Sequence, residues 1–128
     1  MGEIMETNKL NKTIAKFWKS KGRNSIYYLG RCADFVWALR KFLGGGQIYV
    51  IGPGHPIIWH VVLKYNGYYW DVRGKQTIRD VLSKNTMMTS ERDLRPAGSK
   101  EKAHIKKLLN SKFVSDTVRG LKEASGGK

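Results

Sequence analysis

The sequence predicts an α+β fold in which one helix packs on a small antiparallel sheet and basic helices flank both ends. Three patterns predict it. Apolar residues recur with helical spacing over 9–21 and 32–43. Runs rich in β-branched and aromatic residues follow between 47 and 72. Two lysine-rich stretches with helical periodicity, 100–110 and 113–124, come last.

The first helix, 9–21, has an apolar stripe on one side and lysines largely off that stripe, so one face is basic. The residues of the stripe are Leu10, Ile14, Phe17 and Trp18. Gly22 ends this helix, and 23–31 is predicted as a loop. A second helix begins at Cys32 and ends at Leu43, because three consecutive glycines follow it.

Three strands are predicted next. Gln47–Ile51 is separated from the others by 52–56, where two prolines and two glycines cannot continue a strand. Ile57–Tyr65 and Tyr68–Val72 flank Asn66-Gly67, a strong signal for a two-residue hairpin turn. In the register of that turn one face is wholly apolar or aromatic and belongs to the core. Its members are Val61, Leu63, Tyr65, Tyr68, Trp70 and Val72.

A short helix over 77–84 and a polar, irregular region over 85–98 are predicted between the hairpin and the last two helices. The sequence contains no internal repeat and no low-complexity segment. It therefore predicts a single domain over 1–124, followed by a flexible tail over 125–128.

The composition favours an anionic partner. Lys and Arg number 24 against 10 Asp and Glu, which gives a formal net charge of +14 in 128 residues. Such a charge suits a nucleic acid or an acidic protein. No apolar run approaches the roughly 18 residues of a transmembrane helix. The acidic start has no apolar core of a signal peptide, so we expect a cytoplasmic location or delivery into a target cell's cytoplasm.

The hairpin register brings two chemically useful residues to one face. His60 lies diagonally across from Asp71, a separation that a histidine and an aspartate side chain can close. A carboxylate there would orient the imidazole and select its tautomer. Cys32, the only cysteine, begins a predicted helix directly after Arg31, and both the helix N-terminus and the cation favour a thiolate. These three residues predict an activated nucleophile.

Plainer interpretations of the same residues stay open. Cys32 is also consistent with ordinary packing in an apolar helix. His60 is consistent with a hydrogen-bonded strand residue, and Asp71 with an ion pair to Arg73 or Lys64. A lone cysteine predicts no intrachain disulfide and a reducing compartment.

No cofactor and no metal are predicted. A zinc site made of Cys32, His55, His60 and Asp71 would have a spacing that matches no known ligand pattern.

The order of these elements resembles the papain-like cysteine hydrolase superfamily in its compact bacterial forms: NlpC-type peptidases, CHAP amidases and papain-fold toxin or effector domains. The resemblance covers about residues 24–75. It lies in the helix that starts Gly-Arg-Cys-Ala-Asp-Phe-Val at 30–36, the strand His-Val-Val-Leu at 60–63, and the segment Gly-Tyr-Tyr-Trp-Asp-Val-Arg-Gly at 67–74.

The resemblance implies a papain-like fold with Cys32 as nucleophile, His60 as general base and acid, and Asp71 as the residue that orients His60. It also implies a polar side chain upstream of the cysteine that completes an oxyanion hole. The candidates for that role are Asn24, Tyr27 and Tyr28. The chain has no glutamine there, unlike papain, and Arg31 stands where NlpC-type enzymes commonly have aspartate.

The first functional hypothesis is therefore a cysteine hydrolase of an amide or isopeptide bond with a Cys-His-Asp triad, as a toxin or effector domain. A toxin would imply an inhibitor or immunity protein as partner. One alternative is a papain-fold toxin acting on RNA. Another is a non-enzymatic, basic nucleic-acid-binding module. The candidates for anion binding are Lys102, Lys106 and Lys107.

Overall fold

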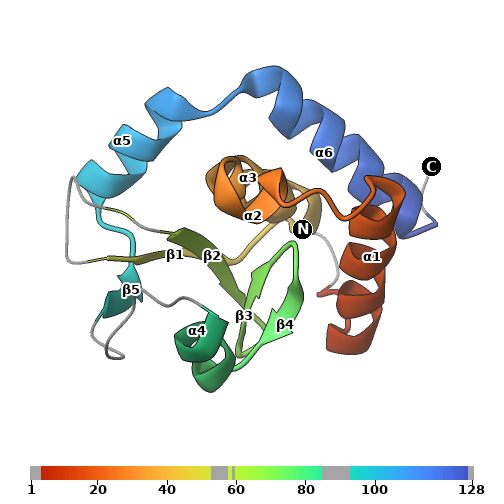
Figure 1. Ribbon diagram of the computed structural model, residues 1–128, viewed down its shortest axis with the longest axis horizontal. Coiled ribbons are helices and arrows are strands. Elements are labelled where there is room, and N and C mark those ends of the chain that lie inside the picture. The colour runs from red at the N-terminus through yellow and green to blue at the C-terminus, as the bar shows by residue number, and fades with distance from the viewer. Residues whose placement is uncertain (1–3, 53–57, 59, 85–92, 127–128) are drawn as a thin grey trace.

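The computed structural model describes residues 4–52, 58, 60–84 and 93–126. It confirms the α+β class: helices pack around one antiparallel sheet of five strands in the order β4-β3-β2-β1-β5 (Figure 1). The helices are α1 (Thr7–Ser20), α2 (Ile26–Leu29), α3 (Cys32–Leu43), α4 (Ile78–Lys84), α5 (Ser99–Leu108) and α6 (Ser111–Ala124). The strands are β1 (Gln47–Ile51), β2 (His60–Tyr65), β3 (Tyr68–Asp71), β4 (Gly74–Gln76) and β5 (Leu94–Pro96).

Three short elements were not predicted. The single turn α2 lies in the segment expected to be a loop, where the Asn24 side chain accepts a hydrogen bond from the Ile26 amide. Strand β4 begins at Gly74, which has a positive φ. Strand β5 lies in a region that was expected to be irregular. A strand of three residues carries too little periodicity to be recognised in a sequence.

The β2–β3 hairpin has the predicted register. Tyr65 pairs with Tyr68 and Leu63 with Trp70. Both turn residues have positive φ, 54° for Asn66 and 79° for Gly67, as a type I′ turn requires. The alternation of side chains along both strands is thereby fixed.

The main core fills the space between the sheet and three helices, α1, α3 and α6. It includes the predicted hairpin face, with Leu63, Trp70 and Val72 fully buried. Helices α1 and α6 approach closely where Gly120 faces Phe17. A Cβ atom at position 120 would lie 2.6 Å from the Phe17 ring. The glycine is therefore needed for this packing.

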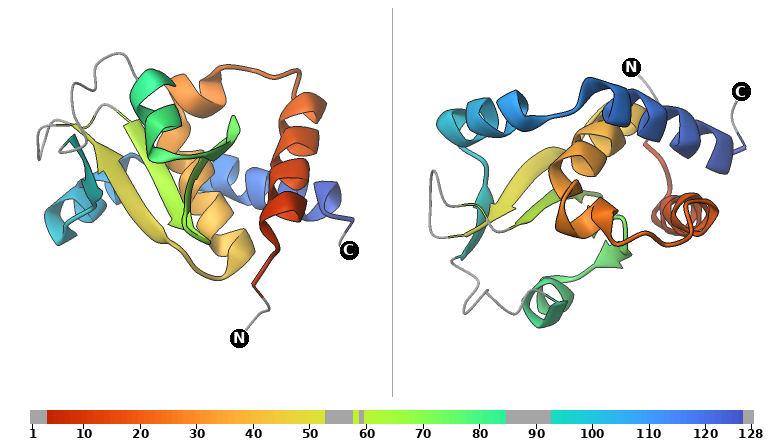
Figure 2. Two further views of the ribbon diagram at one scale, coloured as in Figure 1. Left: turned by 90° about the horizontal axis from the view of Figure 1, so that it is seen from below. Right: turned by 45° about the horizontal axis from the view of Figure 1, so that its top comes forward.

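The opposite face of the sheet is also covered. Helix α4 packs there over a small second cluster, so the sheet lies between α4 on one side and α3 on the other (Figure 2). Its buried members are Ile51, Val62, Val81 and Leu94.

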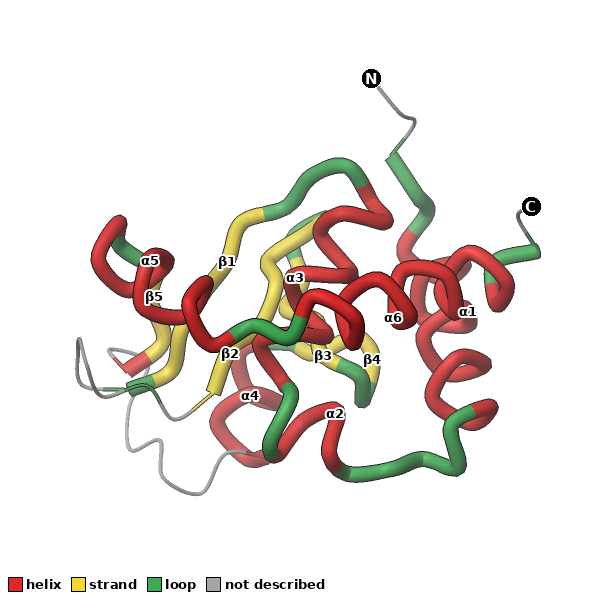
Figure 3. Tube along the Cα trace, turned by 90° about the horizontal axis from the view of Figure 1, so that it is seen from above, coloured by secondary structure: helices red, strands yellow, loops and turns green. Residues whose placement is uncertain are grey.

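Helices α5 and α6 form an arc that passes over α3 (Figure 3). At its start, Arg95 of β5 forms an ion pair with the buried Glu101 of α5. At its middle, the buried Asp34 of α3 accepts a hydrogen bond of 2.7 Å from the Asn110 amide, between α5 and α6. At its end, Ser125 still hydrogen-bonds to α6, whereas the last two residues of the expected tail lie outside the described residues.

Candidate active site

Cys32 is the first residue of α3 and is half-buried. Gly30 and Arg31 precede it at the end of α2, so the thiol lies at the junction of the two helices. It lines a cavity of about 260 Å³ together with His60 and Val61 of β2. The packing of α3 on β2 therefore brings together two residues that are 28 positions apart in the sequence.

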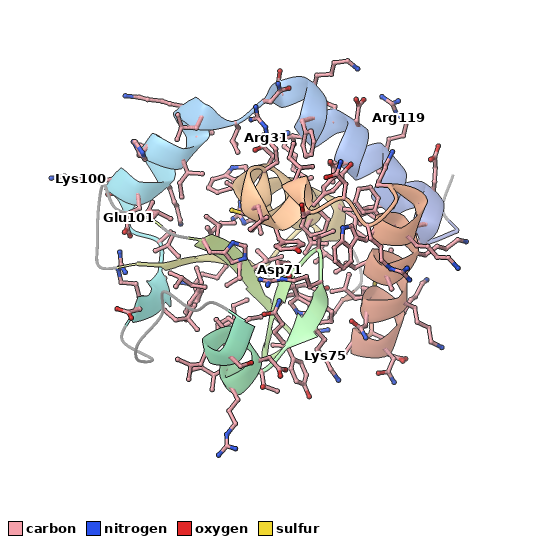
Figure 4. The ribbon with its side chains drawn as sticks, viewed as in Figure 1. Arg31, Asp71, Lys75, Lys100, Glu101 and Arg119 are labelled. Carbon is pink, nitrogen blue, oxygen red and sulfur yellow. The ribbon has the colours of Figure 1, made fainter. Side chains whose placement is uncertain are left out.

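His60 begins β2 and is only 5% exposed. Its Nε2 atom lies 2.9 Å from Oδ2 of Asp71, the last residue of β3. The two residues are diagonal neighbours in the hairpin, as the register requires. Figure 4 shows Asp71 near the centre of the molecule. The carboxylate, which is fully buried, fixes the orientation of the imidazole.

Asp71 has a second partner in Arg73. The Arg73 backbone amide donates to Oδ1 at 2.8 Å, and guanidinium Nη2 donates to Oδ2 at 2.6 Å. Burial acts to raise the pKa of Asp71, but hydrogen bonds from His60 and Arg73 outweigh it and hold that pKa well below its usual range. Asp71 thus contacts both His60 and Arg73, two of the partners that the sequence analysis considered for it. Its carboxylate is ionised between two cationic or potentially cationic groups.

Arg73 itself is held in place by Tyr28. The centre of the guanidinium lies 4.7 Å from the centroid of the Tyr28 ring. Nη2 of Arg73 also lies 3.4 Å from Nε2 of His60. The sequence suggested Arg73 only as an ion-pair partner of Asp71. Arg73 lies in the turn after β3, and its position two residues after Asp71 was the available signal for a place beside the histidine.

The pKa of His60 is raised to about 9. Burial acts to lower it, but hydrogen bonds with Asp71 and Cys32, and their charges, outweigh burial. Nε2 faces Asp71, and the imidazole lines the same cavity as the Cys32 thiol. This arrangement can hold a proton on the imidazole beside a thiolate.

The three candidates for an oxyanion donor lie elsewhere. Asn24 is exposed and uses its side chain in the turn before α2. The Tyr27 ring is buried against Phe17 and Phe113, and burial raises its pKa, with a further effect from Asp116. Tyr28 packs on Arg73. None of the three is among the described residues that line the Cys32 cavity, but Tyr28 lies near the triad through Arg73.

Other residues of the cavity were not predicted as site residues. His104 of α5 contributes an imidazole to the wall. Leu29 and Leu108 also line it and are 73% and 65% exposed. His104 and Leu108 reach the site only because α5 passes over α3, a long-range arrangement that local periodicity does not encode, whereas Leu29 ends α2 three residues before Cys32.

The predicted anion-binding lysines, Lys102, Lys106 and Lys107, are all exposed on α5. Lys106 lines a second cavity, of about 670 Å³, beside the C-terminal end of α3, whereas the other two lysines line neither cavity. His55, a member of the zinc set considered above, lies outside the described residues.

Within the described ranges, no group of three or more His, Cys, Asp or Glu side chains is arranged to hold a metal ion. None of the helices in this part of the chain has the length and apolar character needed to cross a membrane. Comparisons with protein-family models, with curated proteins and with solved structures find no match to this chain.

Proposed function

We propose that this chain is a papain-like cysteine hydrolase that cleaves an amide or isopeptide bond. Cys32 is the nucleophile, His60 the general base and acid, and Asp71 the orienting carboxylate. The observation that carries the proposal is the buried imidazole of His60, which is bonded on Nε2 to Asp71 and lines one cavity together with the thiol of Cys32.

The reaction begins with the thiolate of Cys32, which attacks the carbonyl carbon of the scissile bond. Protonated His60 then donates its proton to the leaving nitrogen, so the amine departs and a thioester remains. Neutral His60 next takes a proton from water. The resulting hydroxide attacks the thioester, releases the carboxylic acid and regenerates Cys32.

The surroundings of the triad support these steps. Asp71 stays ionised because Arg73 and His60 both donate to it, so it stabilises the imidazolium throughout. The backbone amide of Cys32 lies in the first turn of α3, where amides have no partner within the helix. It is the donor available to a developing oxyanion. The exposed Leu29 and Leu108 favour a substrate with an apolar group beside the scissile bond.

Alkylation tests the nucleophile directly. Cys32 is the only cysteine, so iodoacetamide uptake reports on it alone. We expect the folded protein to be labelled faster than the urea-denatured protein at the same pH, because the neighbouring imidazole activates the thiol. His60→Gln should slow labelling, and Lys100→Gln, on the exposed surface of α5, should leave it unchanged. Labelling that requires denaturant would overturn the proposal.

Hydrolysis is tested with a peptide library in water enriched in ¹⁸O, analysed by mass spectrometry. A hydrolase incorporates one oxygen from water into each new carboxyl group. We expect cleavage that is lost in Cys32→Ser. Cleavage that persists in Cys32→Ser would exclude this site as its source.

A second candidate function is attack on RNA by a papain-fold toxin that uses the same residues. The net charge of +14 favours it, since a polyanion is attracted to the whole surface. The test is degradation of a short labelled RNA. Loss of that activity in Cys32→Ser, with no cleavage of any peptide, would select this candidate over the first.

A further inference from the structure

The larger cavity, about 670 Å³, lies at the opposite end of α3 from Cys32. Three helices form its wall (Figure 3). The residues that matter here are Trp37, Arg40 and Lys41 of α3, Lys106 of α5, and Ser111 and Ser115 of α6. We call this space the basic cavity. Its volume lies within the range of roughly 300–1,000 Å³ typical of small-molecule sites.

The charge of the basic cavity has one sign. Arg40, Lys41 and Lys106 line it, and none of the described residues in its wall is acidic. Throughout the part of the chain that the structure describes, no ion pair involves these three cations. Arg40 is nevertheless oriented, because its Nε donates to the Gly46 carbonyl at 3.0 Å. Three cations without counter-charges in one concave site favour the binding of an anion.

The other residues that line the basic cavity favour a ligand larger than a simple inorganic anion. Trp37 is half-buried and contributes a large aromatic surface to the cavity. Ser111 and Ser115 add two hydroxyl groups from the first turns of α6. A planar aromatic ring stacks favourably on an indole, and hydroxyls suit the sugar or phosphate oxygens next to it. A single phosphate would leave most of this volume unfilled.

We propose that the basic cavity binds a nucleotide. Its phosphates contact Arg40, Lys41 and Lys106, and its base stacks on Trp37. The site is distinct from the proposed catalytic centre. The two cavities have only Leu109 in common among their described wall residues, and no triad residue lines the basic cavity. Binding therefore does not depend on hydrolase activity.

Isothermal titration calorimetry with ADP and with pyrophosphate, each at 50 mM salt, tests the proposal. We expect ADP to bind about 5- to 100-fold more tightly than pyrophosphate, the range of one stacked base. The double variant Arg40→Gln/Lys41→Gln should weaken both ligands by about tenfold or more, because it removes charge-assisted contacts. Trp37→Leu should reduce ADP affinity toward that of pyrophosphate and leave pyrophosphate unchanged.

The matched control is Lys102→Gln/Lys107→Gln, which removes the same charge from α5 outside the cavity. It should change ADP affinity less than twofold. Cys32→Ser should bind ADP like the parent protein, so failure of this proposal and failure of the proposed function are distinguishable.

Three results would overturn the proposal. The first is no ADP binding at 1 mM. The second is equal affinity for ADP and pyrophosphate in the parent protein, which would decide the matter even if Trp37→Leu does not fold. The third is equal weakening by the control variant, which would indicate diffuse attraction of anions by the basic surface.

Discussion

The two ends of helix α3 differ in how firmly their side chains are held. At the N-terminal end, the Cys32 thiol lies beside side chains that hydrogen bonds hold in place. At the C-terminal end, exposed cations line an open cavity. At the first end, Asp71 is fully buried and bonded to both His60 and Arg73. At the second end, Arg40 and Lys41 are exposed. Hydrogen bonds thus hold the proposed catalytic residues in place, whereas the proposed ligand-binding site consists of several exposed cations.

This difference follows from what each end packs against. The N-terminal end faces the β2–β3 hairpin, whose register permits one arrangement of side chains. The C-terminal end faces the Gly44–Gly46 segment and the α5–α6 arc, where long flexible side chains reach into open space. We therefore expect single substitutions to have large effects at the first end and graded effects at the second.

The largest expected effect is that of Asp71→Asn on hydrolysis. The change removes the charge that holds the imidazolium and allows the wrong histidine tautomer, so turnover should fall by about 10³- to 10⁴-fold. Rates of peptide cleavage measure it, with Lys100→Gln as the control. If the variant retains its full rate, Asp71 has no role in the mechanism, and substitutions at the N-terminal end of α3 have no larger effect than those at the C-terminal end.

The next effect is a dependence of stability on pH that arises at the N-terminal end alone. The folded-state pKa of His60 is raised from 6.5 to about 9, so its contribution is fully present below pH 6.5 and is lost as pH rises to 9. The loss amounts to about 3 kcal/mol. Asp71, with a lowered pKa, contributes above its usual range near 4 and loses that contribution in acid.

Urea unfolding at pH 5.5, 7.5 and 9.0 checks this expectation. The free energy of unfolding should be greatest at the lowest of these pH values and should decline toward pH 9. His60→Gln should remove most of the decline, whereas His104→Gln should keep it. An equal decline in His60→Gln would assign the pH dependence to other groups.

Asp34→Ala tests the connection between the two ends. The buried Asp34 carboxylate accepts a hydrogen bond from the Asn110 amide, and the preceding residue, Leu109, lines both cavities. Loss of this acceptor should lower the free energy of unfolding by about 1–3 kcal/mol. It should also alter both Cys32 labelling and ADP binding. Asp116→Ala, on the surface of α6, should cost much less, and an equal cost would contradict the role of Asp34.

The smallest effect concerns a residue at neither end. Gln76 of β4 is fully buried, and neither atom of its amide has a hydrogen-bond partner. Gln76→Leu removes two unpaired polar atoms at similar volume, so the free energy of unfolding should rise by about 1 kcal/mol. Urea denaturation measures the change. A loss of stability would mean that the amide has a partner in solution.

The sequence predicted the parts of the fold that depend on local chemistry. The Asn66-Gly67 turn and a side-chain period of two were sufficient to place His60 beside Asp71. The helix boundary at Cys32 followed from its apolar periodicity. By contrast, the basic cavity depends on where α5 and α6 pack, and no local pattern encodes the meeting of Lys106 with Arg40.

The positions of other segments depend on tertiary packing in the same way. Tyr27 was considered as an oxyanion donor because it lies upstream of Cys32, yet the turn of α2 directs its ring into the aromatic core. Strand β5 is recognisable only by its pairing with β1. Both outcomes were decided by tertiary contacts rather than by propensity.

The compact hairpin has a consequence for insertions and deletions. His60, Asp71 and Arg73 come from a single stretch, 60–73, folded back at a two-residue turn. One residue added to the turn would direct the β3 side chains to the opposite face and separate the imidazole from the carboxylate. Cys32, in contrast, reaches His60 through helix packing, so the chain between them is free to change in length. Proteins that share this site should therefore keep a constant spacing after the histidine and a variable spacing before it.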